Sequence, residues 1–113
     1  MKLSNQKIAQ AATVYLERKG YEIRETDIDR EYPLIVAADE FGLAFISCAA
    51  EVGDWPERTF TREEFEAAAI DYLARHEDDV DVTLRADEID IMAVAEGRGI
   101  LRHHLDVPSV SRD

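Results

Sequence analysis

Two apolar runs separated by a short turn constrain the fold of this chain more than any other feature of its sequence. The runs are "PLIVAAD", residues 33–39, and "LAFISCA", residues 43–49, and the "DEFG" between them is typical of a tight turn. Both runs are apolar at successive positions, so both faces of the resulting hairpin need to be covered. The sequence therefore predicts a hairpin at the centre of a sheet, with helices on each side.

Two further segments carry the periodicity of amphipathic helices. The segment 4–19 has one apolar face, which is formed by Ile8, Ala11, Ala12, Tyr15 and Leu16. Ser4 opens the segment as an N-cap, and Gly20 follows it as a C-terminal stop. The segment 61–75 opens with the capping-box pair Thr61 and Glu64. Its apolar face is formed by Phe65, Ala68, Ala69, Tyr72 and Leu73.

The remaining segments are strand-like and lie mostly in the last third of the chain. They are 21–26, 80–84, 88–94 and 100–107. The order is helix, three strands, helix and then one to three strands, which predicts an α/β or α+β fold with a central mixed β-sheet flanked by helices. We expect a single domain over 1–107 and a frayed tail over 108–113.

Composition narrows the class of protein. The 113 residues are 46% hydrophobic, which indicates a globular chain, and they include 25 acids and 13 bases for a net charge of −12. This charge and the lack of a dense basic cluster disfavour nucleic-acid binding. No apolar run is long enough to span a membrane, and the N-terminus lacks an apolar signal-peptide core. Together with the single cysteine, Cys48, these features predict a cytoplasmic protein.

Five segments share the order and approximate spacing of motifs from one known family. They are "AATVYLERKGYEI", "REYPLIVA", "LAFISCA", "EIDIMAV" and "ILRHHLDV". In these places the family has a helix reading A-x-Y-L-x-x-x-G-Y-x-I, then G-E-I-D-L-I-A, a turn, L-V-F-V-E-V-K, then R-F-D-V-V-A-V and a short final strand. From about Ile8 to Val107 the chain therefore resembles the YraN-like family, small bacterial proteins with a restriction-endonuclease-like fold.

The resemblance implies a place for a nuclease site and also its loss. In that fold, acids on each side of the hairpin turn hold Mg²⁺, and a lysine two residues further on helps to activate water and to stabilise charge on the phosphate. Matched residue by residue, these positions fall on Pro33, Ser47 and Ala49, and a glutamate of the family's first helix falls near Ala9. None of these four side chains can hold a divalent metal, so the resemblance implies a degenerate, metal-free site.

The function implied is that of a catalytically inactive endonuclease-like domain, a pseudo-nuclease that needs no cofactor and acts in binding or assembly. Its partner would be another protein or a second copy of the chain. One alternative is an active nuclease using Mg²⁺ or Mn²⁺ whose carboxylates have migrated to Glu31, Glu51, Asp87 or Asp90. A second is a homodimeric module unrelated to nucleic acid, and a third is a domain that binds nucleic acid without cleaving it. Without the resemblance, "SCAA" is simply a strand end that lets a helix pack closely.

A few further residues are weaker candidates. Cys48 lies in an apolar strand of an acidic chain, where a thiolate nucleophile is disfavoured. His103 and His104 are adjacent on a strand and so point to opposite faces, which prevents them from sharing a metal ion; one of them is expected to be a satisfied core histidine. Asp87, Glu88 and Asp90 form an acidic cluster, for which a solvated sheet edge is the favoured interpretation over a weak cation site. Trp55 is expected to cover an edge of the core.

Overall fold

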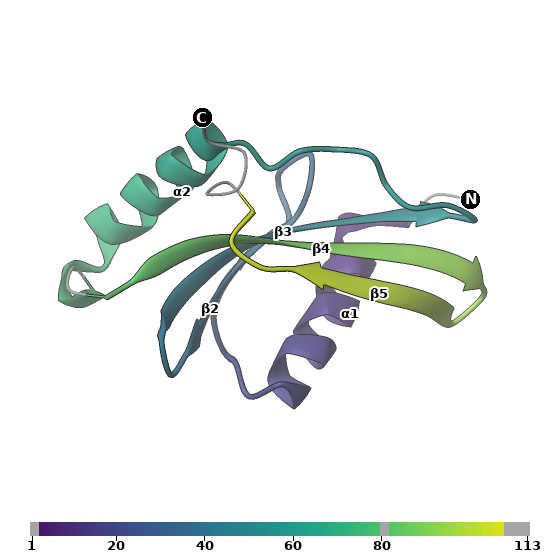
Figure 1. Ribbon diagram of the computed structural model, residues 1–113, viewed down its shortest axis with the longest axis horizontal. Coiled ribbons are helices and arrows are strands. Elements are labelled where there is room, and N and C mark those ends of the chain that lie inside the picture. The colour runs from purple at the N-terminus through teal and green to yellow at the C-terminus, as the bar shows by residue number, and fades with distance from the viewer. Residues whose placement is uncertain (1–2, 80–81, 108–113) are drawn as a thin grey trace.

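The computed structural model describes residues 3–79 and 82–107, which form a five-stranded sheet with two α-helices (Figure 1). In chain order the elements are α1 (Asn5–Arg18), β1 (Glu22–Asp27), β2 (Leu34–Asp39), β3 (Gly42–Val52), α2 (Arg62–Arg75), the 3₁₀ helix η1 (Glu77–Asp79), β4 (Leu84–Ala95) and β5 (Arg98–His104). This order confirms the predicted helix, three strands, helix and final strands. The predicted tail over 108–113 lies outside the described residues.

The sheet is mixed, and the predicted hairpin lies inside it. The strand order is β1-β2-β3-β4-β5, with antiparallel neighbours except for the parallel pair β3 and β4. β3 is therefore the central strand, and neither strand of the 33–39/43–49 hairpin is at an edge. The structure does not form the separate strand expected at 80–84: residues 82 and 83 lie outside any strand, and Leu84 begins β4, which continues through the predicted strand at 88–94. Residues 80–81 of that prediction lie outside the described residues.

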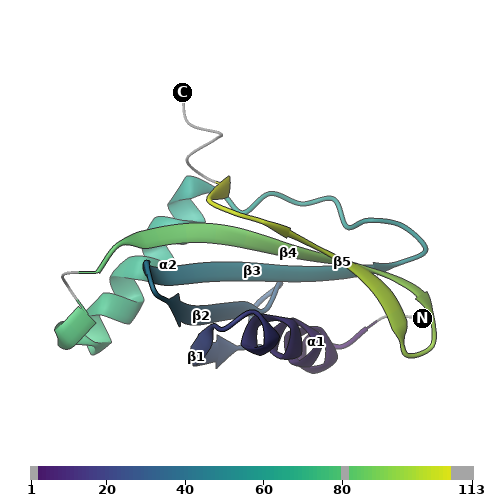
Figure 2. The same ribbon diagram turned by 60° about the horizontal axis from the view of Figure 1, so that its bottom comes forward.

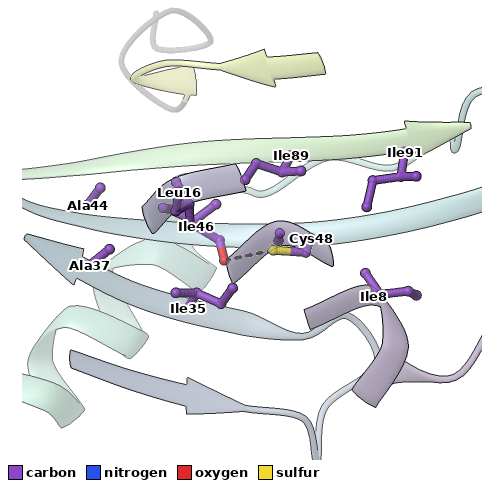
Figure 3. Close-up of a cluster of buried hydrophobic side chains, with 10 residues drawn as sticks. Ile8, Leu16, Ile35, Ala37, Ala44, Ile46, Cys48, Ile89 and Ile91 are labelled. Carbon is purple, nitrogen blue, oxygen red and sulfur yellow. Dashed lines mark hydrogen bonds between the residues drawn. The ribbon is translucent and has the colours of Figure 1, made fainter. Parts of the chain in front are cut away.

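A helix covers each face of the sheet, so the strands bury side chains in two cores (Figure 2). On the α1 face, Ile8 and Leu16 of the helix meet Ile46 and Cys48 of β3 and Ile89 of β4 (Figure 3). On the α2 face the core is formed by Leu34, Val36, Leu43, Phe45, Phe60, Ala68, Ala69, Tyr72 and Ala86. Successive residues of β3 alternate between the two cores, which explains why that run is apolar throughout.

The helix ends follow the expected capping chemistry. The Ser4 side chain accepts a hydrogen bond from the backbone N–H of Lys7 at the start of α1. At the start of α2, Thr61 and Glu64 form both hydrogen bonds of a capping box. Gly20 follows α1 with a φ of +97°, a conformation that ends a helix readily in glycine. These contacts confirm the predicted helix boundaries.

The tight turn between β2 and β3 depends on Gly42, which has a φ of +145°. A Cβ atom at this position would lie 2.2 Å from the carbonyl oxygen of Thr83, the residue just before β4. The same carbonyl accepts a hydrogen bond of 2.8 Å from the backbone N–H of Leu43. Gly42 therefore allows β4 to start close against the turn.

Neither of the two described α-helices is both long and apolar enough to cross a membrane.

Candidate functional site

The sheet register gathers the polar positions of β3, β4 and β5 on the α2 face. Ser47 lies beside Glu88, which pairs with His104 on β5. One step further along, Ala49 lies beside Asp90, and Asp90 pairs with Arg102. Residues directly opposite one another on neighbouring strands share a face. We call these two rows, Ser47–Glu88–His104 and Ala49–Asp90–Arg102, the polar rows; they include two positions that the resemblance assigned to the former nuclease site.

The guanidinium of Arg58, from the loop between β3 and α2, lies against the polar rows. Its nitrogens donate to the Ser47 hydroxyl at 2.6 Å, to the Ser47 carbonyl at 2.8 Å, to the Ile89 carbonyl at 3.1 Å and to Asp90 Oδ1 at 3.0 Å. The Arg58 side chain is only 4% exposed, and its Nε–H has no acceptor among residues 3–79 and 82–107. An arginine is therefore the buried cation of this site.

Two further contacts use the remaining acidic groups of the polar rows. Glu88 Oε2 accepts from the backbone N–H of Phe60 at 2.8 Å, and His104 Nε2 lies 3.4 Å from Asp90 Oδ2. Asp90 is 7% exposed and Asp87 is fully buried. The predicted solvated acidic edge is therefore wrong for these two aspartates, because each is buried and forms an ion pair with an arginine.

The four positions of the predicted degenerate site are divided between the two faces of the sheet. Ser47 and Ala49 are on the α2 face, whereas Ala9 is buried on α1, the helix that covers the opposite face. Pro33 immediately precedes β2, and its carbonyl accepts from the backbone N–H of Cys48. Only the pair on β3 therefore belongs to the polar rows.

The four alternative carboxylates are also dispersed. Glu31 and Glu51 are exposed and border one cavity of about 120 Å³ together with Ala49. Asp90 is held by Arg58, and Asp87 points to the α1 face. Among the described residues, no group of three or more acidic, histidine or cysteine side chains could hold a metal ion. The structure thus places Glu31, Glu51 and Asp90 around the end of β3, with Asp90 held by Arg58, and Asp87 on the other face.

Asp87 is the centre of a second polar network, on the α1 face. It accepts from Arg85 Nε at 3.1 Å and lies 2.9 Å from His103 Nε2. The other ring nitrogen of His103 lies 3.0 Å from the Tyr15 hydroxyl on α1, and Arg85 also donates to the Tyr21 hydroxyl at 2.6 Å. Burial, and secondarily the charge of Asp87, raises the pKa of Tyr15, so its hydroxyl stays protonated. These contacts connect β4 and β5 to α1.

The two histidines point in the predicted directions. His103 contacts Asp87 on the α1 face and His104 contacts Asp90 on the α2 face, so the adjacent imidazoles do not converge. His103, with a side chain 8% exposed and both ring nitrogens engaged, is the satisfied core histidine that the sequence predicts for one of the pair.

Cys48 is fully buried among aliphatic side chains on the α1 face (Figure 3). Its thiol donates weakly to the Ile46 carbonyl at 3.7 Å. Burial raises the pKa of the Cys48 thiol to about 12. The side chain therefore behaves as a small core residue and has no nucleophilic thiolate at neutral pH.

A divalent metal of the kind used by nucleases does not fit the polar rows. Such a metal needs several hard oxygen ligands, and carboxylates supply most of them in proteins. Ser47 and Ala49 stand where the resemblance places the acid and the lysine, and the Asp90 carboxylate is already paired with a fixed guanidinium. The negative charge of Asp90 is balanced by the Arg58 guanidinium.

Sequence reasoning missed Arg58, the residue that organises the site. It lies in "EVGDWPER", an irregular segment with no periodicity to indicate which side chains turn inward. The available signal was indirect: an acid such as Asp90 within an apolar strand needs a buried partner, because an unpaired buried charge is very costly. Arg102 was missed as well, and its guanidinium stacks 3.7 Å from the ring centre of Trp55.

Comparison with known proteins does not assign the chain to a family: no protein-family model matches it, and a search of the curated proteins finds no matching relative.

Proposed function

We propose that this chain is a catalytically inactive relative of the YraN-like family, with a restriction-endonuclease-like fold, and that it acts by binding a partner. One observation carries the proposal: a buried arginine lies where the resemblance would place a metal ion. Arg58 joins Ser47 and Asp90 by direct hydrogen bonds. The polar rows are therefore suited to structural support rather than to hydrolysis of a phosphodiester.

The charge of the molecule supports a protein partner over a nucleic acid. With 25 acids and 13 bases, the chain has a net charge of −12, which repels a polyanion. The lone buried thiol of Cys48 is compatible with a reducing compartment, and the proposal places the protein in the cytoplasm.

The proposal is tested by metal binding and cleavage assays on the purified protein. Calorimetry with Mn²⁺ is expected to show no saturable binding below millimolar concentrations. Single-stranded, double-stranded and branched DNA and RNA are expected to remain intact with Mg²⁺ or Mn²⁺. Cleavage that Glu31→Ala or Glu51→Ala abolishes, and that the exposed control Glu63→Ala retains, would replace this proposal with the migrated-site nuclease.

A further inference from the structure

We propose that the outer edge of β5 binds a short acidic segment of a partner protein, which joins the sheet in extended conformation as a sixth strand. The inference rests on the proposed function, a domain that acts by binding, and it names the surface and the chemistry of the partner.

The backbone of β5 is available for such pairing. β5 is the last strand in the sheet order, so among the described residues no strand pairs with its outer side. An edge of this kind presents free N–H and C=O groups that an added strand can satisfy. The opposite edge, β1, is one residue shorter than β5 and carries three acids.

The charge of β5 is opposite to that of the chain as a whole. β5 contains Arg98, Arg102 and two histidines but no acid, in a protein with a net charge of −12. Both arginines are exposed, and neither has a carboxylate partner within residues 3–79 and 82–107. Trp55 supports the Arg102 guanidinium by stacking against it. Opposite charge would therefore draw an acidic strand to this edge.

The spacing along β5 defines the pattern of that strand. Arg98, Ile100 and Arg102 alternate with other residues and so lie on one side of the sheet, and Ile100 is 49% exposed between the two cations. Cross-strand neighbours on one face contact each other directly. The complementary strand carries an acid, an apolar residue and a second acid at every second position.

The short length of β5, with acids beyond both of its ends, favours a peptide over a nucleic acid as the partner. The seven residues of β5 extend for roughly 23 Å. Glu96 lies just before β5 and Asp106 just after it, so an acidic residue follows each end of this positively charged strand. A polynucleotide carries a charge on every phosphate and would meet these acids, whereas a short peptide with two acids fits between them.

The experiment measures fluorescence anisotropy of a labelled peptide with the sequence Thr-Glu-Thr-Val-Thr-Glu-Thr, added to the full chain at physiological salt. We expect saturable binding that the double substitution Arg98→Glu/Arg102→Glu weakens by about tenfold or more. The matched control Lys7→Glu/Arg18→Glu makes the same charge change on exposed positions of α1 and is expected to alter binding by less than about twofold, because salt screens distant charges.

Peptide controls separate backbone pairing from simple charge attraction. A version with lysine in place of glutamate is expected not to bind. We also test two versions of the peptide, one N-methylated at the odd positions and the other at the even positions. At least one of them is expected to lose binding, because its methylated nitrogens cannot donate hydrogen bonds to β5. Circular dichroism confirms that both protein variants are folded.

Several results would overturn the inference. These are equal binding of the lysine peptide, full binding of both N-methylated peptides, tighter binding of an oligothymidylate, or a β5-dependent dimer of the chain that excludes the peptide. Each leaves the Mn²⁺ and cleavage assays unaffected, so failure of this inference is distinguishable from failure of the proposed function.

Discussion

Replacing Arg58 with methionine tests whether the buried guanidinium holds the polar rows together. The change removes the 3.0 Å bond to Asp90, whose side chain is 10% exposed. Among the described residues, that carboxylate then keeps only the contact with His104 at 3.4 Å. Removing one partner of a buried ion pair costs about 3–5 kcal/mol. The lost bonds to Ser47 and to the Ile89 carbonyl add about 1 kcal/mol each.

Two effects reduce this cost. The Arg58 Nε–H is buried without an acceptor in the described part of the chain, so its removal recovers about 1–3 kcal/mol of desolvation energy. Methionine also fills part of the vacated volume with apolar atoms. We therefore expect the free energy of unfolding to fall by about 4 kcal/mol. With a urea slope of about 2 kcal/mol/M, the midpoint moves down by about 2 M.

Urea unfolding followed by circular dichroism measures this change, and two more variants make the result specific. Arg62→Ala, which removes an exposed arginine 3.8 Å from Glu66, is expected to cost under about 0.5 kcal/mol. The double variant Arg58→Met/Asp90→Asn is expected to regain at least half of the loss, because it leaves no unpaired buried charge. A loss below about 1 kcal/mol for Arg58→Met, or no recovery in the double variant, would refute the reasoning.

Three further outcomes follow from the fold. Cys48 is expected to resist thiol reagents at pH 8 in the folded protein and to react on unfolding in urea, because burial raises its pKa to about 12; fast reaction of the native protein would contradict this. The pKa of Glu25 is lowered, mainly by its hydrogen bond from Arg75, so the ionised carboxylate stabilises the fold above pH 4.5 and this stabilisation is lost as the pH falls through the lowered pKa. Glu25→Gln should therefore make the urea midpoint depend less on pH in this acid range. An unchanged pH dependence would contradict this expectation. Gly42→Ala is expected to lower the free energy of unfolding by more than about 2 kcal/mol in the same urea assay, because the new Cβ atom would clash with Thr83. Gly97 also has a positive φ but has open space for a Cβ atom, so Gly97→Ala is expected to cost about 1 kcal/mol. Equal losses would show that the close contact at Gly42 is unimportant.

The central hairpin was predictable because burial on both faces leaves a direct trace in the sequence. Each residue from Leu43 to Cys48 faces one of the two cores or the buried Ser47 site, so the whole segment lacks charge. The helix ends were predictable for a similar reason, since the side chains of Ser4 and Thr61 act on backbone groups only a few positions away.

The polar rows were less predictable, because their contacts join distant parts of the chain. Asp90 meets Arg58 only after α2 has connected β3 to β4 in a parallel pair, and no local pattern encodes that approach. The acids at Asp87 and Asp90 therefore resembled a solvated cluster, although both are buried. Periodicity predicts which face a residue occupies, but not which partner lies across it.

The parallel pairing of β3 with β4 also has a consequence for the folding reaction. β3 joins β2 through a two-residue turn, but it meets β4 only after the intervening loop and α2 have folded back, as the register from Leu43 and Leu84 onward shows. Non-local pairing of this kind slows folding. Until β4 arrives, β3 is an apolar strand with an open edge, which other unfolded chains can pair with. Refolding yield should therefore fall as protein concentration rises, even though β3 is the most enclosed strand of the native sheet.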